Sequence, residues 1–320
     1  MMGIAKDMKF YLAPMEGLTT YTFRTVWNQY YGGADRFFTP FIANRQLNSR
    51  ERNDILPEHN VGMHTIPQIL TNKADEFLEL AEVIAQYGYE EVNLNLGCPS
   101  GTVVARKRGA GFLGVPKELD AFLDEIFTKC PLRISVKTRI GVQDDSEWDT
   151  LLSVYEKYPI AELTIHPRLQ VQGYQGRPNR EAYAKAVLRL SCPLCYNGDI
   201  NSAEDLASVG EVLAKDNAVM IGRGILRNPM LFRQLRGENT GAREERLATF
   251  REYHRALLAG YESIMSGDTN TLFKMKDLWT FFGQNFEAPE KELKQIRKAK
   301  TVSEYRMAVQ MLLQNCPMKE

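Results

Sequence analysis

The sequence predicts an α/β fold: a (β/α)₈ TIM barrel followed by a small C-terminal domain made only of helices. Short apolar runs alternate with amphipathic segments up to about residue 237, and this alternation implies a parallel sheet. Eight such units occupy roughly 230 residues, which suits a closed barrel with a typical size of ~250 residues. A doubly wound sheet is disfavoured because no G-x-G-x-x-G motif follows the first expected strand.

Each expected strand of the barrel is a short apolar run. The second lies somewhere within residues 34–42. The others span residues 10–14, 66–70, 91–96, 133–138, 161–166, 193–197 and 218–222.

The segments between the later strands have the pattern of helices. Residues 73–87 place Phe77, Ala81 and Ile84 on one helical face. Pro116 suits the first turn of a helix over residues 116–127. Further helices are expected at 146–158, 180–190 and 202–213.

After about residue 237 no strand signal remains. We therefore divide the chain into a barrel domain, residues 1–237, and a helical domain, residues 243–320. Such helices usually pack on one another. Within the third of them, the run KELKQIRKAK carries Lys291 and Lys294, and its plain interpretation is a solvated helix face. The four expected helices span residues 244–265, 271–282, 289–300 and 302–315.

The composition limits the class of protein. A chain of 320 residues with 44% hydrophobic and 25% charged residues suits one large domain with an appendage. No run of about 18 apolar residues occurs, so no membrane span is expected. The first residues lack the apolar core and cleavage site of a signal peptide, so we expect none, and five cysteines suit a reducing cytoplasm. Lys and Arg together number 40, as do Asp and Glu, so a nucleic-acid site requires a local patch.

Residues that could contact a ligand, most of them polar, stand at the ends of seven expected strands. In (β/α)₈ barrels the active site lies at the carboxyl ends of the strands, so these groups are expected to converge on one face. They are Pro14 and Met15, Gln68, Asn95 and Cys98, Lys137 and Arg139, His166 and Arg168, Asn197 with Gly198 and Asp199, and Gly222 with Arg223.

The most informative stretch is NLNLGCPSGTVVARKRGAG at residues 93–111. An apolar strand stops at Cys98, and a loop rich in glycine and basic residues follows, for which we expect flexibility. A thiol and the nearby Asn95 amide at the end of a strand are typical of an active site. The alternative is a small buried cysteine before a turn proline. The basic residues of the loop are Arg106, Lys107 and Arg108.

Three further features have open interpretations. The Gly-Arg-Gly turn around Arg223 follows the last strand, where barrels of this kind often bind phosphate. Lys137 lies in an apolar strand and is either a Schiff-base nucleophile or a contact to the polar edge of a cofactor. His166 contacts a ligand or belongs to the core. Cys192 and Cys195 lack a second ligand pair, so we expect no metal site.

Seven motifs in this order resemble the dihydrouridine synthases, flavin enzymes that reduce uridine in transfer RNA. The resemblance covers essentially the whole chain, and the G-C-P signature with K-x-R and H-x-R is its most specific part. The motifs are APMEG at 13–17, PQIL at 67–70, NLNLGCPSGTV with the following RGAGFL, SVKTRIG at 135–141, LTIHPR at 163–168, YNGDI at 196–200 and MIGRG at 220–224.

The resemblance implies that the barrel binds FMN and that NADPH is the reductant. Pro14 and Met15 would line the flavin, and Gln68, Lys137 and His166 would meet its ring and ribityl chain. The ribityl and phosphate contacts would come from Asn197, Gly198, Asp199, Gly222 and Arg223.

The resemblance also implies roles toward a tRNA substrate. Cys98 would protonate C5 of a uracil that has left its stack, and Asn95 would bind the edge of that base. Arg139 and Arg168 would contact the base or a phosphate. The basic residues Arg106, Lys107, Arg108, Lys291 and Lys294 would contact RNA.

Two departures and three alternatives accompany this interpretation. Pro167 stands where the family usually has a small residue, and residues 50–64 match no motif of the family. The alternatives are an FMN barrel that acts on a small molecule, a Schiff-base aldolase that uses Lys137, and a non-catalytic RNA-binding protein. We expect a cytoplasmic enzyme that is a monomer.

Overall fold

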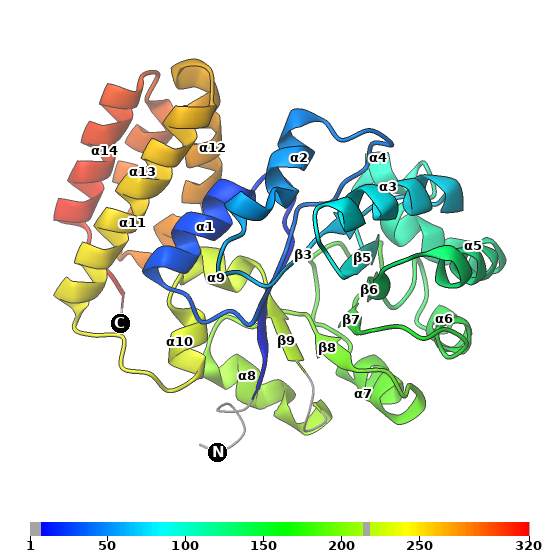
Figure 1. The fold of residues 1–320 in the computed structure, drawn as a ribbon. Coiled ribbons are helices and arrows are strands. Elements are labelled where there is room, and N and C mark those ends of the chain that lie inside the picture. Colours follow the sequence, from blue (N-terminus) through cyan, green and yellow to red (C-terminus); the bar gives the residue numbers. More distant parts are fainter. Residues whose placement is uncertain (1–7, 214–217, 320) are drawn as a thin grey trace.

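The strands form one parallel sheet that curls into a barrel, as Figure 1 shows. The structure is a computed structural model and describes residues 8–213 and 218–319. Around the barrel the order is β3-β2-β1-β9-β8-β7-β6-β5-β4, with every pair parallel. The predicted barrel is therefore confirmed. The strands are β1 (Phe10–Leu12), β2 (Arg36–Phe38), β3 (Thr65–Ile66), β4 (Gln68–Ile69), β5 (Glu91–Leu96), β6 (Arg133–Arg139), β7 (Leu163–His166), β8 (Leu194–Tyr196) and β9 (Ala218–Ile221).

The expected third strand is divided in two by Pro67. Proline has no backbone N–H to give to a ladder, so pairing is interrupted there. Strand β3 pairs with β2, whereas β4 pairs with β5. An isolated bridge between Ile42 and Ile69 also links this region to the segment after β2. The third strand of the barrel therefore consists of two short strands, β3 and β4, and each pairs with a different neighbour.

The predicted helices of the barrel are present, and two are shorter than expected. The helix expected over residues 146–158 ends at Tyr155 as α6. The helix expected over residues 202–213 ends at Val209 as α8, and one turn of 3₁₀ helix follows. Five helices were not predicted: α1, α2, α4 (Gly101–Val104), α9 and α10. The helices are α1 (Tyr21–Tyr30), α2 (Ser49–Ile55), α3 (Ala74–Gln86), α5 (Pro116–Lys129), α6 (Glu147–Tyr155), α7 (Arg180–Arg189), α8 (Ala203–Val209), α9 (Arg223–Arg227) and α10 (Leu231–Leu235).

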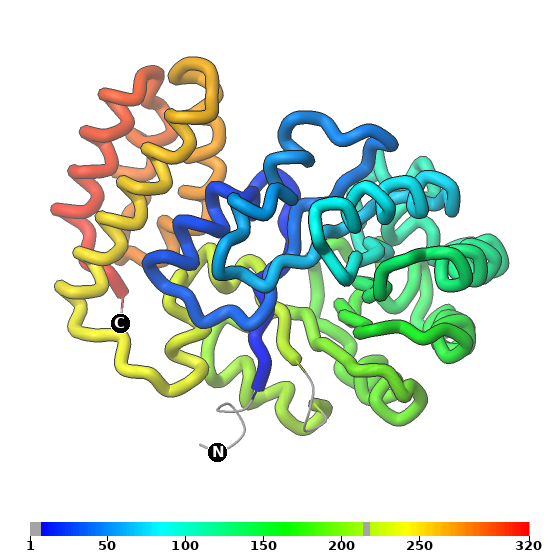
Figure 2. The backbone as a smooth tube through the Cα atoms, in the orientation of Figure 1, coloured from blue at the N-terminus to red at the C-terminus, as the bar shows by residue number. Residues whose placement is uncertain are grey.

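Four helices follow the barrel and pack beside it, at the left of Figures 1 and 2. They are α11 (Arg243–Ile264), α12 (Gly267–Phe282), α13 (Glu290–Lys298) and α14 (Val302–Asn315). Their core holds a polar group, because the Tyr305 hydroxyl accepts from Trp279 Nε1 at 2.7 Å and lies 2.7 Å from His254 Nε2. No described helix has both the length and the apolar character that a membrane span requires.

The helical domain contacts the first loop and first helix of the barrel. Helix α11 packs along α1, and the hydroxyls of Thr20 and Tyr261 lie 3.1 Å apart. Lys274 of α12 donates to the carbonyl oxygen of Gly17 at 3.1 Å. These contacts hold α12 beside the loop that follows β1.

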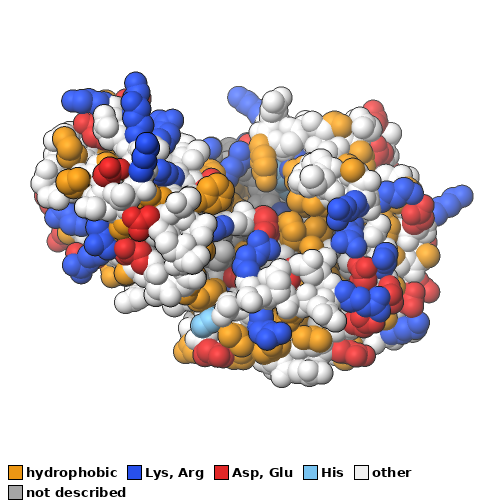
Figure 3. Space-filling model, turned by 90° about the horizontal axis from the view of Figure 1, so that it is seen from above, with side chains coloured by type: hydrophobic (Ala, Val, Ile, Leu, Met, Phe, Trp, Pro, Cys, Tyr) orange, Lys and Arg blue, Asp and Glu red, His pale blue; other side chains and the backbone are white. Residues whose placement is uncertain are grey.

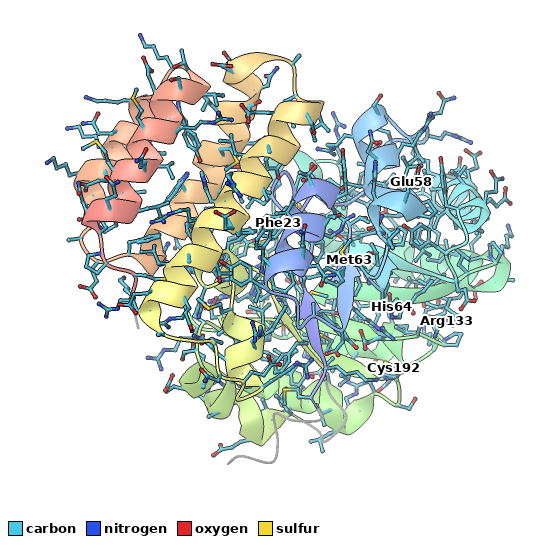
Figure 4. All side chains as sticks on the ribbon, turned by 60° about the vertical axis from the view of Figure 1, so that its left-hand side comes forward. Phe23, Glu58, Met63, His64, Arg133 and Cys192 are labelled. Carbon is cyan, nitrogen blue, oxygen red and sulfur yellow. The ribbon has the colours of Figure 1, made fainter. Side chains whose placement is uncertain are left out.

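The amino-terminal ends of the strands form the opposite end of the barrel. Figure 4 labels His64, Arg133 and Cys192 on this side of the molecule; Arg133 begins β6, and His64 and Cys192 shortly precede β3 and β8. The buried carboxylate of Glu91 pairs with Arg133 at 3.2 Å. We assign this end to stability, because barrels of this type carry chemistry at the carboxyl ends of their strands.

Candidate active site

A cavity of about 360 Å³ lies at the carboxyl ends of the strands. Figure 3 looks onto this end of the molecule, where the surface is hollowed between the helical domain and the barrel. The cavity brings together every residue that the sequence predicted to hold a cofactor, as well as Cys98, Asn95 and Arg139. The predicted cofactor residues along its wall are Pro14, Met15, Gln68, Lys137, His166, Asn197, Gly198, Asp199, Gly222 and Arg223.

The side chain of Asn95 builds the turn that carries Cys98. Its Oδ1 accepts hydrogen bonds from the backbone N–H groups of Gly97, at 3.0 Å, and Cys98, at 2.9 Å. Its Nδ2 donates to Oε1 of Gln68 at 2.7 Å. Asn95 therefore fixes the position of the thiol from within the barrel.

The thiol of Cys98 is half-buried. Burial raises its pKa above the ordinary value, while a backbone hydrogen bond at Ser100 acts in the opposite direction. A raised pKa keeps the proton on sulfur at neutral pH. This state suits a proton donor rather than a thiolate nucleophile.

The segment after Cys98 is folded rather than irregular. It forms α4 (Gly101–Val104) and a 3₁₀ segment, η2 (Gly109–Gly114), and the N–H of Ala110 donates to the Cys98 carbonyl at 3.0 Å. Gly109 has a φ of +55°, and a Cβ there would lie 2.9 Å from the Cys98 oxygen. Glycine is required here because any side chain would push the loop off the cysteine.

Lys137 places a cation inside the barrel. Its Nζ donates to Oδ1 of Asn197 at 2.7 Å, and Nδ2 of Asn197 donates to the carbonyl of Met220 at 2.8 Å. These bonds tie β6 to the end of β8 and to β9. Burial, with a smaller contribution from Arg139, lowers the pKa of Lys137 to about 8.

His166 is buried and neutral. Nη1 of Arg168 lies 3.0 Å from its Nε2. Because a guanidinium only donates, Nε2 accepts, and the ring proton belongs on Nδ1. Burial holds the pKa of His166 well below its usual value, and the charge of Arg139 acts in the same direction.

Arg168 is the one strand-end residue of the prediction that does not line the cavity. Its side chain is fully buried and donates to the carbonyl oxygens of Gln175 and Gly176 at 3.2 and 2.6 Å. It also pairs with the carboxylate of Asp199. Asp199 has a φ of +39° and accepts from Arg223 at 2.8 Å as well. Arg168 thus holds the loop after β7.

Tyr174 was not predicted and stands at the wall of the cavity with 56% of its surface exposed. The guanidinium of Arg223 lies 4.3 Å from its ring centre, and that of Arg139 lies 5.6 Å away. Glu16, Phe41 and Phe281 also line the cavity unpredicted. For Tyr174 a signal existed, since it is an aromatic residue in a glycine-rich loop after a strand that ends in histidine.

Arg139 is also engaged by the backbone. Its Nε donates to the carbonyl of Gly97 at 2.9 Å, and Nη1 donates to that of Leu169 at 2.9 Å. Burial lowers its pKa to about 10, so it remains charged at neutral pH.

The basic residues of the loop and of α13 lie outside the cavity. Lys107 pairs with Glu118 at 3.3 Å, and Arg108 pairs with Glu76 at 2.9 Å. Arg106 is exposed. Lys291 and Lys294 are exposed on α13. Their contact with RNA stays a prediction.

Comparisons with known proteins agree with the site. The family described as "Dihydrouridine synthase (Dus)" matches residues 11–315. The tRNA-dihydrouridine synthase B of Pasteurella multocida (strain Pm70) is 30% identical over 228 residues, which cover 70% of this chain and 68% of that protein. The tRNA-dihydrouridine(16) synthase of Neisseria meningitidis serogroup B (strain ATCC BAA-335 / MC58) is 26% identical over 309 residues, which cover 92% of each.

Among solved structures, morphinone reductase aligns with a TM-score of 0.51 and 13% identity, over 77% of this chain and 91% of that chain. This likeness concerns the fold alone and agrees with the barrel. The family match, in contrast, extends over nearly the whole chain and includes the strand ends that form the cavity. The chain belongs to the dihydrouridine synthase family.

Proposed function

We propose that this protein reduces the C5=C6 bond of uridine in tRNA to 5,6-dihydrouridine, as a monomer, with bound FMN and with NADPH as reductant. The observation that carries the proposal is the position of Cys98. Its protonated thiol lines the same cavity as Lys137, His166 and Arg223 in a chain of this family. A proton donor and a cofactor site thus share one wall.

The residues of the cavity fit a flavin mononucleotide. A Cβ on Gly222 would lie 3.1 Å from Sδ of Met15, and one on Gly198 would lie 3.0 Å from Pro178, so these glycines keep the floor open. Arg223, at the start of α9, offers a cation to a phosphate beside Gly222. Gln68, Lys137 and Asn197 supply polar groups deeper in the barrel.

A bound flavin would supply the hydride chemistry, from NADPH to C6 of the uracil. Lys137 contributes a positive charge that stabilises negative charge on a reduced ring. His166 accepts from Arg168, so its Nδ1–H is the ring proton left for a ligand.

Cys98 completes the reduction by delivering a proton. A C–H bond forms at C5 of uracil as the S–H bond breaks, and the resulting thiolate takes a proton from solvent. Asn95 holds the sulfur in place through the N–H of Cys98. The base must leave its stack to reach the cavity, because the thiol is half-buried at the end of β5.

The aldolase alternative also depends on Lys137, whose pKa of about 8 would suit a nucleophile. Membership of the dihydrouridine synthase family favours the reductase. The two proposals predict different visible spectra. The aldolase would be a colourless protein, and borohydride would trap its lysine in a covalent adduct with the substrate.

The test begins with the visible spectrum of the purified protein before and after anaerobic NADPH. We expect flavin bands near ~370 and ~450 nm that bleach with NADPH. The reduced protein should then form dihydrouridine in unmodified tRNA transcripts. A colourless protein that FMN does not reconstitute would reject the cofactor, and a bleaching protein without RNA product would favour a small-molecule substrate.

A further inference from the structure

A second cavity, which we call the interdomain cavity, lies between the barrel and the helical domain. Its volume is about 220 Å³. The barrel contributes Asn201 and Arg227 to its wall, and the helical domain contributes Arg246, Gln284 and Lys319. Asn201 lines the active-site cavity as well, so the two cavities are neighbours.

The charge of the interdomain cavity is one-sided. Three of its side chains are cationic: Arg227 at the end of α9, Arg246 in the first turns of α11, and Lys319 after α14. Within residues 8–213 and 218–319, no carboxylate lines this space. Three cations that face one small cavity repel one another, so the arrangement is stabilised by an anion.

Two of these cations have unused hydrogen-bonding capacity. The Nε atoms of Arg227 and Arg246 are both buried without a hydrogen-bond partner in the described part of the chain. Arg227 keeps one bond, from Nη1 to Oδ1 of Asn201 at 2.9 Å. A buried N–H without a partner costs about 1–3 kcal/mol, so two of them in one wall point to an acceptor that residues 8–213 and 218–319 do not supply.

Neutral amides complete the wall. The amide of Asn228 donates to Oε1 of Gln234 at 2.6 Å, which leaves the Gln234 NH₂ group for another acceptor. Both residues line the cavity. Guanidinium forks match the oxygens of carboxylates and phosphates, and the higher negative charge of a phosphate suits a wall with three cations.

We propose that the interdomain cavity binds a phosphate group, held between Arg227 of the barrel and Arg246 of the helical domain. The group is either a free phosphate or a phosphodiester of the bound tRNA. By joining cations from both domains it fixes the position of the helical domain against the barrel. This site is separate from the flavin phosphate expected beside Gly222, and it goes beyond the proposed function.

The test is thermal unfolding of the FMN-saturated protein in inorganic phosphate and in chloride, at equal pH and ionic strength. Saturation with FMN fills the phosphate position at Gly222. We expect phosphate to raise the Tm of the wild type by roughly 2–4 °C. Arg246→Gln should lose this rise and have a Tm in chloride that is no lower than that of the wild type, because the substitution removes a guanidinium with a buried unpaired N–H.

A matched control is Arg251→Gln, since Arg251 is an exposed arginine of the same helix and does not line the cavity. It should keep the full response. An equal rise in all three proteins, or no rise in the wild type, would overturn the proposal. The chain also ends in Glu320, next to Lys319 in the sequence. A variant without Glu320 is therefore measured too. If phosphate raises the Tm of that variant but not of the wild type, the proposal is overturned as well.

A second arm identifies the source of the phosphate. The affinity for tRNA is measured in phosphate and in chloride at equal ionic strength, for the wild type and for Arg246→Gln. If a phosphodiester occupies the cavity, phosphate weakens tRNA binding by the wild type more than binding by the variant. If free phosphate occupies it, the two proteins respond to phosphate equally in tRNA binding and still differ in Tm.

Discussion

The backbone N–H of Cys98 donates to Oδ1 of Asn95 at 2.9 Å, and this bond places the thiol at the wall of the cavity. The same oxygen accepts from Gly97, so one side chain holds two successive amides. The geometry of the proton donor therefore depends on a residue that is itself buried in the barrel.

Asn95→Ala should lower the rate of uridine reduction by roughly 10- to 100-fold and leave the flavin bound. Without Asn95 the N–H groups of Gly97 and Cys98 lose their acceptor, at a cost of ~1–3 kcal/mol, and the thiol is no longer held in position. Asn95→Asp is the control, because it keeps the acceptor for both amides, and it should retain more activity than alanine. Equal rates for the two variants would show that the hydrogen bonds from the N–H groups of Gly97 and Cys98 do not affect the reaction.

Lys137→Met should weaken FMN binding by roughly 10- to 100-fold, or ~1.4–2.8 kcal/mol. The substitution removes both the buried cation and its bond to Asn197. Flavin fluorescence titration of the apoprotein measures the change. Lys129→Met, at an exposed position on α5, is the control and should bind FMN as the wild type does. Unchanged affinity in the Lys137 variant would contradict its place in the cofactor site.

Acid should destabilise the helical domain through His254. Burial lowers its pKa from 6.5 to about 3 in the folded protein. Between these values the unfolded state binds more protons, so stability is complete above pH 6.5 and falls as the pH decreases toward 3. The expected slope is about 1.4 kcal/mol per pH unit for this group. Chemical denaturation of wild type and His254→Gln over pH 4–7 tests it, and equal slopes would exclude His254 as the cause.

Lys291→Glu with Lys294→Glu should weaken tRNA binding and reduce its salt dependence, without loss of flavin. Both side chains are exposed on α13, so the substitutions leave the packing of the domain intact. The control makes the same charge change at Lys129 and Lys185, which are exposed on α5 and α7. Equal affinities for both double variants would assign the run on α13 to a solvated face.

The cavity could be located from the sequence because its position follows from a rule of barrel topology. Once eight strand–helix units are recognised, the carboxyl ends of parallel strands must share one face, and Cys98, Lys137 and His166 follow. The buried position of Arg168 could not be predicted in this way, because it depends on hydrogen bonds to the loop after β7. Tyr174 was missed although an aromatic residue in a glycine-rich loop is a signal, because tertiary contacts decide which residue of that loop lies at the wall.

The elements that sequence reasoning missed are mostly short. Helix α2 had a local signal, a capping box between Asn48 and Glu51, within a stretch that matched no family motif. Helices α9 and α10 have five residues each, too few for a periodic pattern. The division at Pro67 follows from the missing N–H of proline, but only the barrel pairing reveals it.

The most direct test of the proposed reaction is a single turnover in D₂O with protonated NADPH and unmodified tRNA. We predict one solvent deuterium at C5 of the dihydrouridine, delivered by Cys98, while C6 receives the hydride of the reduced flavin. Cys98→Ala should keep its flavin and its bleaching by NADPH and form little product. Product formed by Cys98→Ala at the rate of the wild type, with the same C5 deuterium, would contradict the role of the thiol.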